Sequence, residues 1–70
     1  MRSVPSLRTY EISVSGNIGT LADVFRPHPV RFEDGSSVIR VERVDQATLF
    51  GLIGHVQELG LDLREVRIAD

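Results

Sequence analysis

Few residues in this 70-residue chain have the types and spacing that chemistry at a site requires. The sequence has no cysteine, which excludes a disulfide, a thiolate metal site and an iron–sulfur cluster. Its two histidines, His28 and His55, lie far apart, and neither has a partner at metal-ligand spacing. His28 stands between two prolines that stiffen its backbone, but no nucleophile or second acid accompanies it. We therefore predict no catalytic residue, no metal and no cofactor.

The segment GNIGT, residues 16–20, is a candidate ligand-binding loop. It places backbone amides at the start of an expected helix, where an anion could dock. The competing interpretation is that its glycines only supply turn geometry. The candidate ligand-binding residues are Gly16, Asn17, Gly19 and Thr20.

The composition is that of an ordinary globular domain, with 41% hydrophobic and 26% charged residues. A formal charge of −2 lacks the basic surface that a nucleic-acid-binding protein needs. No apolar run approaches the ~18 residues of a membrane span, and MRSVPSLR lacks the apolar centre of a signal peptide. We expect a cytoplasmic protein that binds neither nucleic acid nor membrane.

All eight basic residues are arginine. Guanidinium groups are rigid forks for carboxylates or phosphates, which is one interpretation of this bias. The other, which we favour, is a coding bias towards arginine. The outward face of the expected sheet has mixed charges, which fits solvent contact or a wet partner surface. We interpret it as solvent-facing; it comprises Thr9, Glu11, Ser13, Arg31, Glu33, Arg40, Glu42 and Arg67.

Small size limits what this chain can bury. A domain of 70 residues buries only about 60% of the surface that its unfolded chain exposes. Without disulfides or a metal, good helix caps or a second subunit must supply the remaining stability. We assign residues 1–6 to a flexible N-terminal lead and residues 7–70 to a single α+β domain.

The first half of the domain predicts a strand, a short helix and a hairpin. Tyr10, Ile12 and Val14 alternate with polar residues, which indicates a half-buried strand ending at Gly16. Thr20, with Asp23 three residues later, forms a weak capping box for a short helix that the RPHP segment, residues 26–29, ends.

The hairpin around EDGSS allows two registers. A two-residue Asp-Gly turn pairs Val30 with Ile39, whereas a four-residue DGSS loop pairs Val30 with Val41. The longer loop pairs more apolar residues but sets Arg31 opposite Arg40. The sequence leaves both registers open.

The second helix is the best-specified element. Asp45 is its N-cap, and Val44 and Leu49 are placed as a hydrophobic staple. Gly60 follows as the left-handed C-terminal residue of a Schellman ending. One helical stripe is apolar and should face the sheet; it comprises Leu49, Leu52, Ile53, Val56 and Leu59.

The side of this helix opposite the stripe is unusual. It holds Ala47, Gly51 and Gly54, with Phe50 at its border. Each interior glycine costs about 0.5–1 kcal/mol relative to alanine, so a compensating contact is expected. We predict a self-association interface formed by Ala47, Phe50, Gly51 and Gly54. The competing interpretation is that Phe50 completes the core at the edge of the sheet.

Residues 63–69 predict a last strand, with Val66 and Ile68 inward. The resulting order βαββαβ predicts a ferredoxin-like two-layer sandwich with a short first helix. Right-handed crossovers then place the first and third strands in the centre of the sheet. The alternative is a three-stranded meander plus one helix and a C-terminal strand, which applies if the first helix is only a turn.

Nearly the whole chain resembles a group of small uncharacterised bacterial proteins. The matching segments are YEISVSGNI (10–18), ADVF (22–25) and VDQATLFGLIGHVQELGLDLREV (44–66). The group's pattern is YEIxVxGxL, then ADWF, then VDQAALHGLLxxIRDLGLPLxSV. This chain departs from it at Val24, Phe50 and Asp62, where the group usually has tryptophan, histidine and proline. The resemblance implies no assigned activity.

The segment NIGTLADV (17–24) also resembles the ligand loop of ACT-type regulatory domains. In such domains the loop and the following helix bind small ligands such as amino acids at a dimer interface. The resemblance implies a small-ligand regulatory domain that uses residues 16–20.

Our leading hypothesis is a non-enzymatic module that forms a dimer or binds a protein partner. The first alternative is the small-ligand regulatory domain. The second is a small dimeric enzyme, such as a cyclase or monooxygenase with ferredoxin-like subunits, which rests on fold analogy alone.

Overall fold

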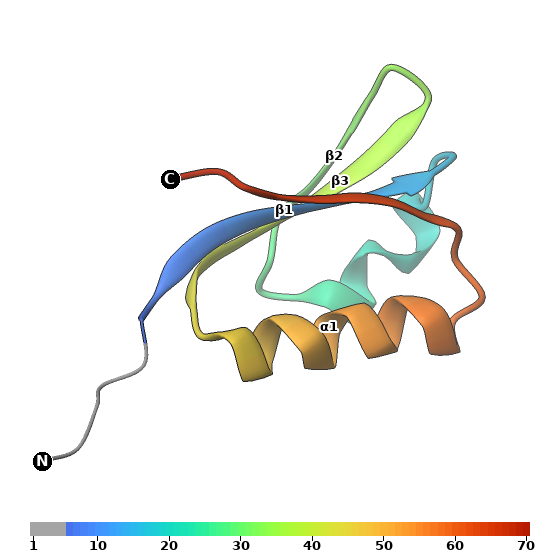
Figure 1. The fold of residues 1–70 in the computed structure, drawn as a ribbon. Coiled ribbons are helices and arrows are strands. Elements are labelled where there is room, and N and C mark those ends of the chain that lie inside the picture. The colour runs from blue at the N-terminus through green and yellow to red at the C-terminus, as the bar shows by residue number, and fades with distance from the viewer. Residues whose placement is uncertain (1–5) are drawn as a thin grey trace, which may run out of the picture.

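One antiparallel sheet of four strands carries its helical elements on a single side (Figure 1). This computed structural model describes residues 6–70; the expected lead, residues 1–6, therefore lies almost entirely outside the described residues. The elements are β1 (Arg8–Ser15), the 3₁₀ helix η1 (Gly19–Phe25), β2 (Val30–Glu33), β3 (Ser36–Val44), α1 (Gln46–Glu58) and β4 (Leu63–Ile68).

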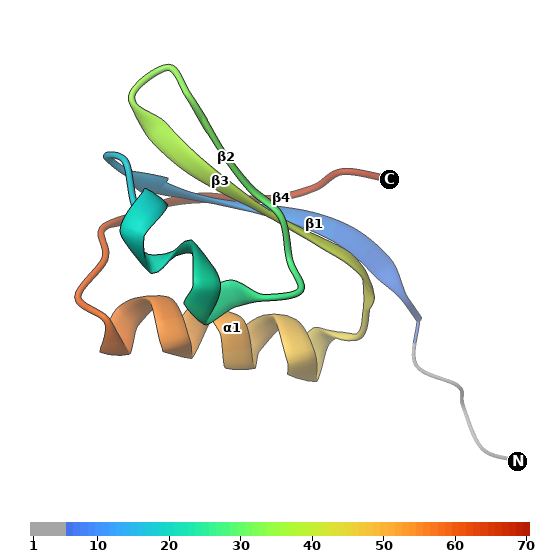
Figure 2. The ribbon, with the colours of Figure 1, turned by 180° about the vertical axis from the view of Figure 1, so that it is seen from behind.

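The strand order is β2-β3-β1-β4, and every neighbouring pair is antiparallel. The first and third strands occupy the centre, as the crossover argument predicts. The meander alternative is wrong, because β3 lies between β1 and β2. Seen from behind, η1 lies beside α1 on the same side of the sheet (Figure 2), so the connection from β1 to β2 passes over that side.

The hairpin register is set by a two-residue turn. Val30 pairs with Ile39 and Glu33 with Ser36, which is the Asp-Gly alternative. Asp34 and Gly35 both have positive φ, 52° and 77°, as a type I′ turn requires. The longer DGSS loop is therefore wrong. The physical reason is twist, since a type I′ turn matches the right-handed twist of the two strands.

The capping box at Thr20 is wrong. The helix begins at Gly19 with Ile18 as its N-cap, and no side chain caps it. Ile18 is buried, and its N–H donates to the Ser37 hydroxyl at 3.0 Å, so a tertiary contact fixes the entry to the helix. Its end is as predicted: Arg26, before Pro27, is extended with φ −54° and ψ 143°.

Both ends of α1 match the sequence prediction. The Asp45 carboxylate accepts the Thr48 N–H at 2.9 Å, which makes Asp45 the N-cap. At the other end Gly60 has φ +73°, and Leu61 N–H donates to Val56 C=O at 3.1 Å. This bond is the long bond of a Schellman ending. Within residues 6–70, no helix combines the length and the hydrophobicity needed to span a bilayer.

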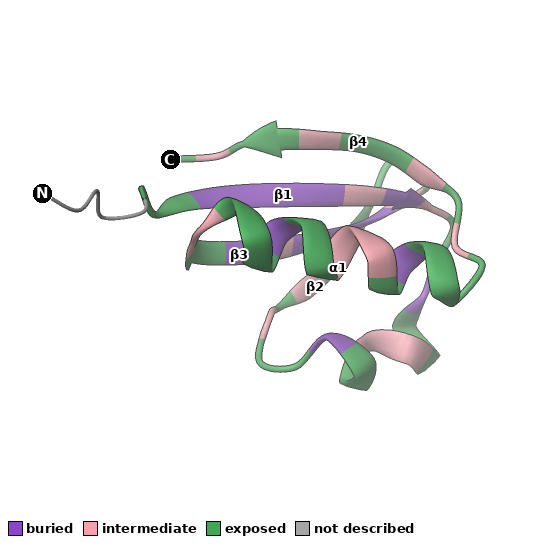
Figure 3. Cartoon of the chain, turned by 60° about the horizontal axis from the view of Figure 1, so that its bottom comes forward, coloured by how far each residue is buried: buried purple, intermediate pink, exposed green. Residues whose placement is uncertain are grey.

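The core lies between the inner face of the sheet and the two helical elements, and β1 is the most continuously buried strand (Figure 3). From α1, Leu49 and Val56 are buried, whereas Leu52 and Ile53 are only partly buried against the core. The fully enclosed centre consists of Phe25, Ile12, Ile39, Val14, Val41 and Val56.

Leu59 and Ile68, which the sequence predicts to face the core, remain exposed, and so does Phe32. Phe32 lies on the edge strand β2 in a hairpin that projects away from the helical layer (Figure 1). Ile68 lies on the other edge strand and pairs with the core residue Tyr10, so it is on the predicted inner face but stays exposed there. Edge strands have a neighbour on one side only, so part of their apolar surface stays uncovered.

Candidate functional site

The outer face of α1 holds the predicted interface residues at the surface. Ala47, Phe50 and Gly51 are exposed and Gly54 is half-buried. Phe50 is 61% exposed, so the interpretation that this ring completes the core is wrong. A Cβ atom added at Gly51 or Gly54 would meet nothing within 4 Å. Neither glycine is therefore required by packing within a single copy of the described chain.

This outer face of α1 is also almost uncharged. Glu58 is the one carboxylate of the helix, and His55 is its one basic side chain; the other residues are apolar, glycine, or neutral polar. The solvent-facing side of a surface helix ordinarily carries charged residues. An exposed aromatic ring on a nearly neutral helix is therefore an unusual solvent surface.

The GNIGT loop uses much of its hydrogen-bonding capacity internally. Gly16 N–H donates to Gly35 C=O at 2.9 Å, and Gly19 N–H donates to Asn17 Oδ1 at 2.9 Å. The Ser37 hydroxyl accepts the Ile18 N–H and donates to Gly16 C=O at 2.7 Å.

The loop glycines also have local structural reasons. Gly16 has φ +83°, and a Cβ at Gly19 would lie 3.2 Å from Asn17 Oδ1. Turn geometry therefore accounts for Gly16, and Asn17 crowds the space beside Gly19. Thr20 is exposed at the start of η1. Ligand binding by Gly16, Asn17, Gly19 and Thr20 stays a prediction.

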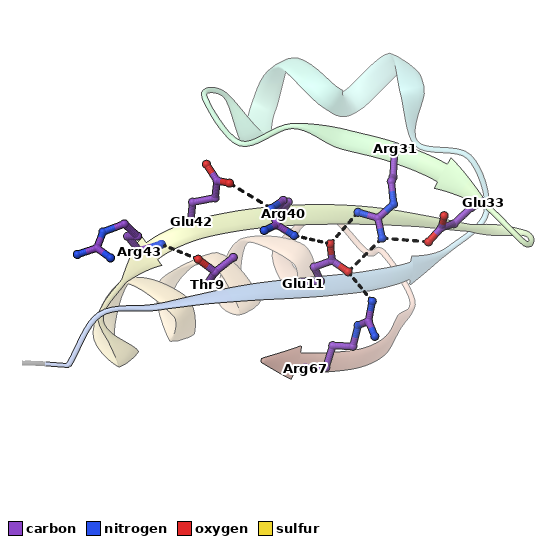
Figure 4. Close-up of polar contacts among 8 residues, drawn as sticks. All are labelled: Thr9, Glu11, Arg31, Glu33, Arg40, Glu42, Arg43 and Arg67. Atoms are coloured by element: carbon purple, nitrogen blue, oxygen red, sulfur yellow. Dashed lines mark hydrogen bonds and ion pairs between the residues drawn. The ribbon is translucent and has the colours of Figure 1, made fainter. Parts of the chain in front are cut away.

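The open face of the sheet, the side away from α1, contains a buried carboxylate. Glu11 lies on the central strand β1 and is only 3% exposed. Its oxygens accept four hydrogen bonds from three arginines, which come from the three other strands (Figure 4). A carboxylate has about four lone-pair sites, so Glu11 is fully satisfied.

Each arginine of this Glu11 cluster binds differently. Arg31 makes a bidentate pair, with distances of 2.8 and 3.0 Å to the two carboxylate oxygens. Arg67 donates to Oε1 at 2.8 Å, and Arg40 donates to Oε2 at 3.1 Å. Two further carboxylates complete the network: Glu33 accepts from Arg31, and Glu42 accepts from Arg40.

The cluster strongly favours the charged form of Glu11. Hydrogen bonds from Arg31, then from Arg67, lower the pKa of Glu11 from its ordinary 4.5 to about 2, although burial opposes the shift. The same contacts raise the pKa of Arg31 above its ordinary value. Three arginines and three glutamates cancel in formal charge, so the cluster is a neutral network joining all four strands and not an anion site.

From the sequence, these residues share one face, with Glu11 expected in contact with solvent. The information that the sequence lacked was the cross-strand register. Glu11 lies directly opposite Arg40 on β3 and directly opposite Arg67 on β4. Direct cross-strand partners of opposite charge attract each other, and only the registers of β1 with β3 and β4 show which residues face Glu11.

Among residues 6–70, no group of three or more His, Asp or Glu side chains is placed to hold a metal ion. A family model matches residues 9–67, which is most of the chain. The chain belongs to that family, Domain of unknown function (DUF8691). This membership is consistent with the resemblance to small uncharacterised proteins. No curated protein and no solved structure matches the chain.

Proposed function

We propose that this member of the family is a non-enzymatic interaction module that pairs with a second copy of itself through the outer face of α1. The observation that carries the proposal is Phe50, whose ring is 61% exposed beside Gly51 and Gly54. Interior glycines lower helix stability by about 0.5–1 kcal/mol each. Nothing in a single described chain requires them, because a Cβ at either position would meet open space.

A second copy suits this face for two reasons. A two-fold interface brings the same patch together from both copies, so Phe50 of one copy can lie over the glycine backbone of the other. The face is nearly uncharged, so apposing two copies brings together few like charges. A small domain with a thin core also gains stability from a partner. A different protein presenting an apolar groove is the alternative occupant.

We also propose that the fold is a reduced ferredoxin-like sandwich, in which η1 takes the place of the first crossover helix. Support comes from the all-antiparallel order β2-β3-β1-β4 and from the position of η1 on the same side of the sheet as α1. Placing both helical elements on one side leaves the outer face of α1 and the open face of the sheet available to partners.

Analytical ultracentrifugation over a micromolar concentration range tests the self-association. We expect the parent protein to form a dimer. Gly54→Arg should be monomeric because its long side chain keeps the two helices apart, and Phe50→Ser should be monomeric because it lacks the aromatic ring. Phe32→Ser is the matched control, since it removes an aromatic ring that is 53% exposed on β2. A monomeric parent, or a Gly54→Arg protein with the parent's mass, would contradict the proposal.

A further inference from the structure

A second candidate site lies where β1 begins and α1 begins. A cavity of about 330 Å³ is lined there by Ser6, Arg8, Tyr10, Asp45 and Gln46. Its size falls at the lower end of the range of small-molecule sites, roughly 300–1,000 Å³. Its lining residues carry hydroxyl, guanidinium, carboxylate and amide groups. It therefore differs from the apolar outer face of α1 and from the self-satisfied Glu11 cluster.

Tyr10, which lines this cavity, has a hydroxyl with no hydrogen-bond partner among the described residues. Its ring belongs to the core and the residue is only 7% exposed. Within the described part of the chain, the hydroxyl makes no hydrogen bond, and no fully buried side-chain oxygen lacks a partner. Tyr10 is also one of the residues that line the cavity. The hydroxyl of a buried tyrosine ordinarily forms a hydrogen bond.

Two residues of opposite charge, Arg8 and Asp45, line the same cavity. Arg8 has a half-exposed side chain whose ion-pair contact within the described residues is a long one, 3.9 Å to Asp70. Asp45 uses its Oδ1 to cap α1 through Thr48, and that bond lowers the pKa of Asp45, so the carboxylate stays ionised. The first amides of a helix have no intrahelical acceptor and favour negative charge.

We propose that this cavity, the Tyr10 pocket, binds a small zwitterion of the free amino-acid class. The ligand carboxylate lies towards the Arg8 guanidinium, the Tyr10 hydroxyl and the start of α1, and its ammonium group lies towards the free oxygen of Asp45. A simple anion would be repelled by Asp45, and a simple cation would be repelled by Arg8. A molecule that carries both charges satisfies both groups. This inference does not depend on dimerisation, because none of its residues belongs to the outer face of α1.

The test screens the common L-amino acids at millimolar concentration against the full-length protein by thermal shift and by amide chemical shifts. The best binder is then compared with its deaminated acid and its decarboxylated amine. We expect the amino acid to raise the melting temperature and to shift the amides of Tyr10 and Gln46, while the two single-charge analogues have little effect.

Two conservative variants test the assigned contacts. Tyr10→Phe keeps the ring, and Asp45→Asn keeps a good N-cap, so both should fold. Each should weaken binding about tenfold or more, as expected for a lost hydrogen bond to a charged group. Arg64→Gln, on β4 away from the cavity, is the control and should bind like the parent. The proposal is wrong if no amino acid shifts these amides, if the single-charge analogues bind equally well, or if both variants keep the parent's affinity.

Discussion

The outer face of α1 and the open face of the sheet are both uncovered surfaces of the same chain, but they differ in which groups they expose to solvent. On the sheet, three arginines converge on Glu11 and leave it 3% exposed. On the helix, Phe50 is 61% exposed, and charge is limited to Glu58 and His55. The sheet face satisfies its own polar groups, whereas the helix face leaves apolar surface uncovered.

The comparison teaches where stability and association reside. A carboxylate that accepts four hydrogen bonds needs no external partner, so the Glu11 cluster contributes to the fold. An exposed ring beside bare helix backbone adds little to a single copy but can anchor a partner. The charge of a face therefore does not indicate where a partner binds this protein. The more highly charged face is the one whose polar groups already bind one another.

The largest expected difference between the two faces is in folding stability. Glu11→Gln should lower the free energy of unfolding by about 1–3 kcal/mol, because a neutral amide cannot accept strong hydrogen bonds from three arginines. Glu33→Gln, which removes a half-exposed carboxylate that forms an ion pair with Arg31, should change it by less than about 1 kcal/mol.

Denaturant titration at neutral pH measures both values, at a protein concentration low enough to exclude association. Phe50→Ser, measured in the same way, should also change stability by less than about 1 kcal/mol. A loss at Phe50 that exceeds the loss at Glu11 would reverse the comparison.

Acid should abolish the contribution of Glu11 to folding stability. Because the folded-state pKa of Glu11, about 2, lies below its ordinary 4.5, its contribution to stability is complete above pH 4.5 and is lost as pH falls towards 2. The difference in unfolding free energy between the parent and Glu11→Gln should therefore shrink across this window. Urea titrations at several pH values give the difference. A gap that stays constant down to pH 2 would show that the arginines do not hold Glu11 ionised.

The smallest expected effect is at Gly51, where one substitution should change monomer stability and dimerisation in opposite directions. Gly51→Ala should raise the stability of the monomer by about 0.5–1 kcal/mol, because alanine is the better helix former and its Cβ meets nothing within 4 Å. The same methyl group should weaken dimerisation if two helices approach closely there.

Thermal unfolding at low concentration, combined with sedimentation at high concentration, reads both quantities from one variant. A Gly51→Ala protein that is more stable and associates as well as the parent would remove the reason for a glycine at the interface.

Much of the local structure was predictable because it depends on neighbours in sequence. The Asp45 cap and the left-handed Gly60 lie at the two ends of one helix, and each works through bonds to residues only a few positions away. Helical spacing placed Phe50 at the border of the outer face of α1, but its exposure came from the structure. The start of η1 did not, because Ile18 is fixed by Ser37 from a strand far away in the chain.

The sequence by itself therefore determined which segments form strands and α1, and which side of each element is apolar, since the periods of two and 3.6 are properties of the backbone. Only the tertiary structure decided the registers of β1 against β3 and β4. Those registers turned Glu11 from an expected solvated residue into a buried one, because its partners Arg40 and Arg67 lie 29 and 56 positions away. The tertiary structure also placed Tyr10 at a cavity between two elements that are distant in sequence.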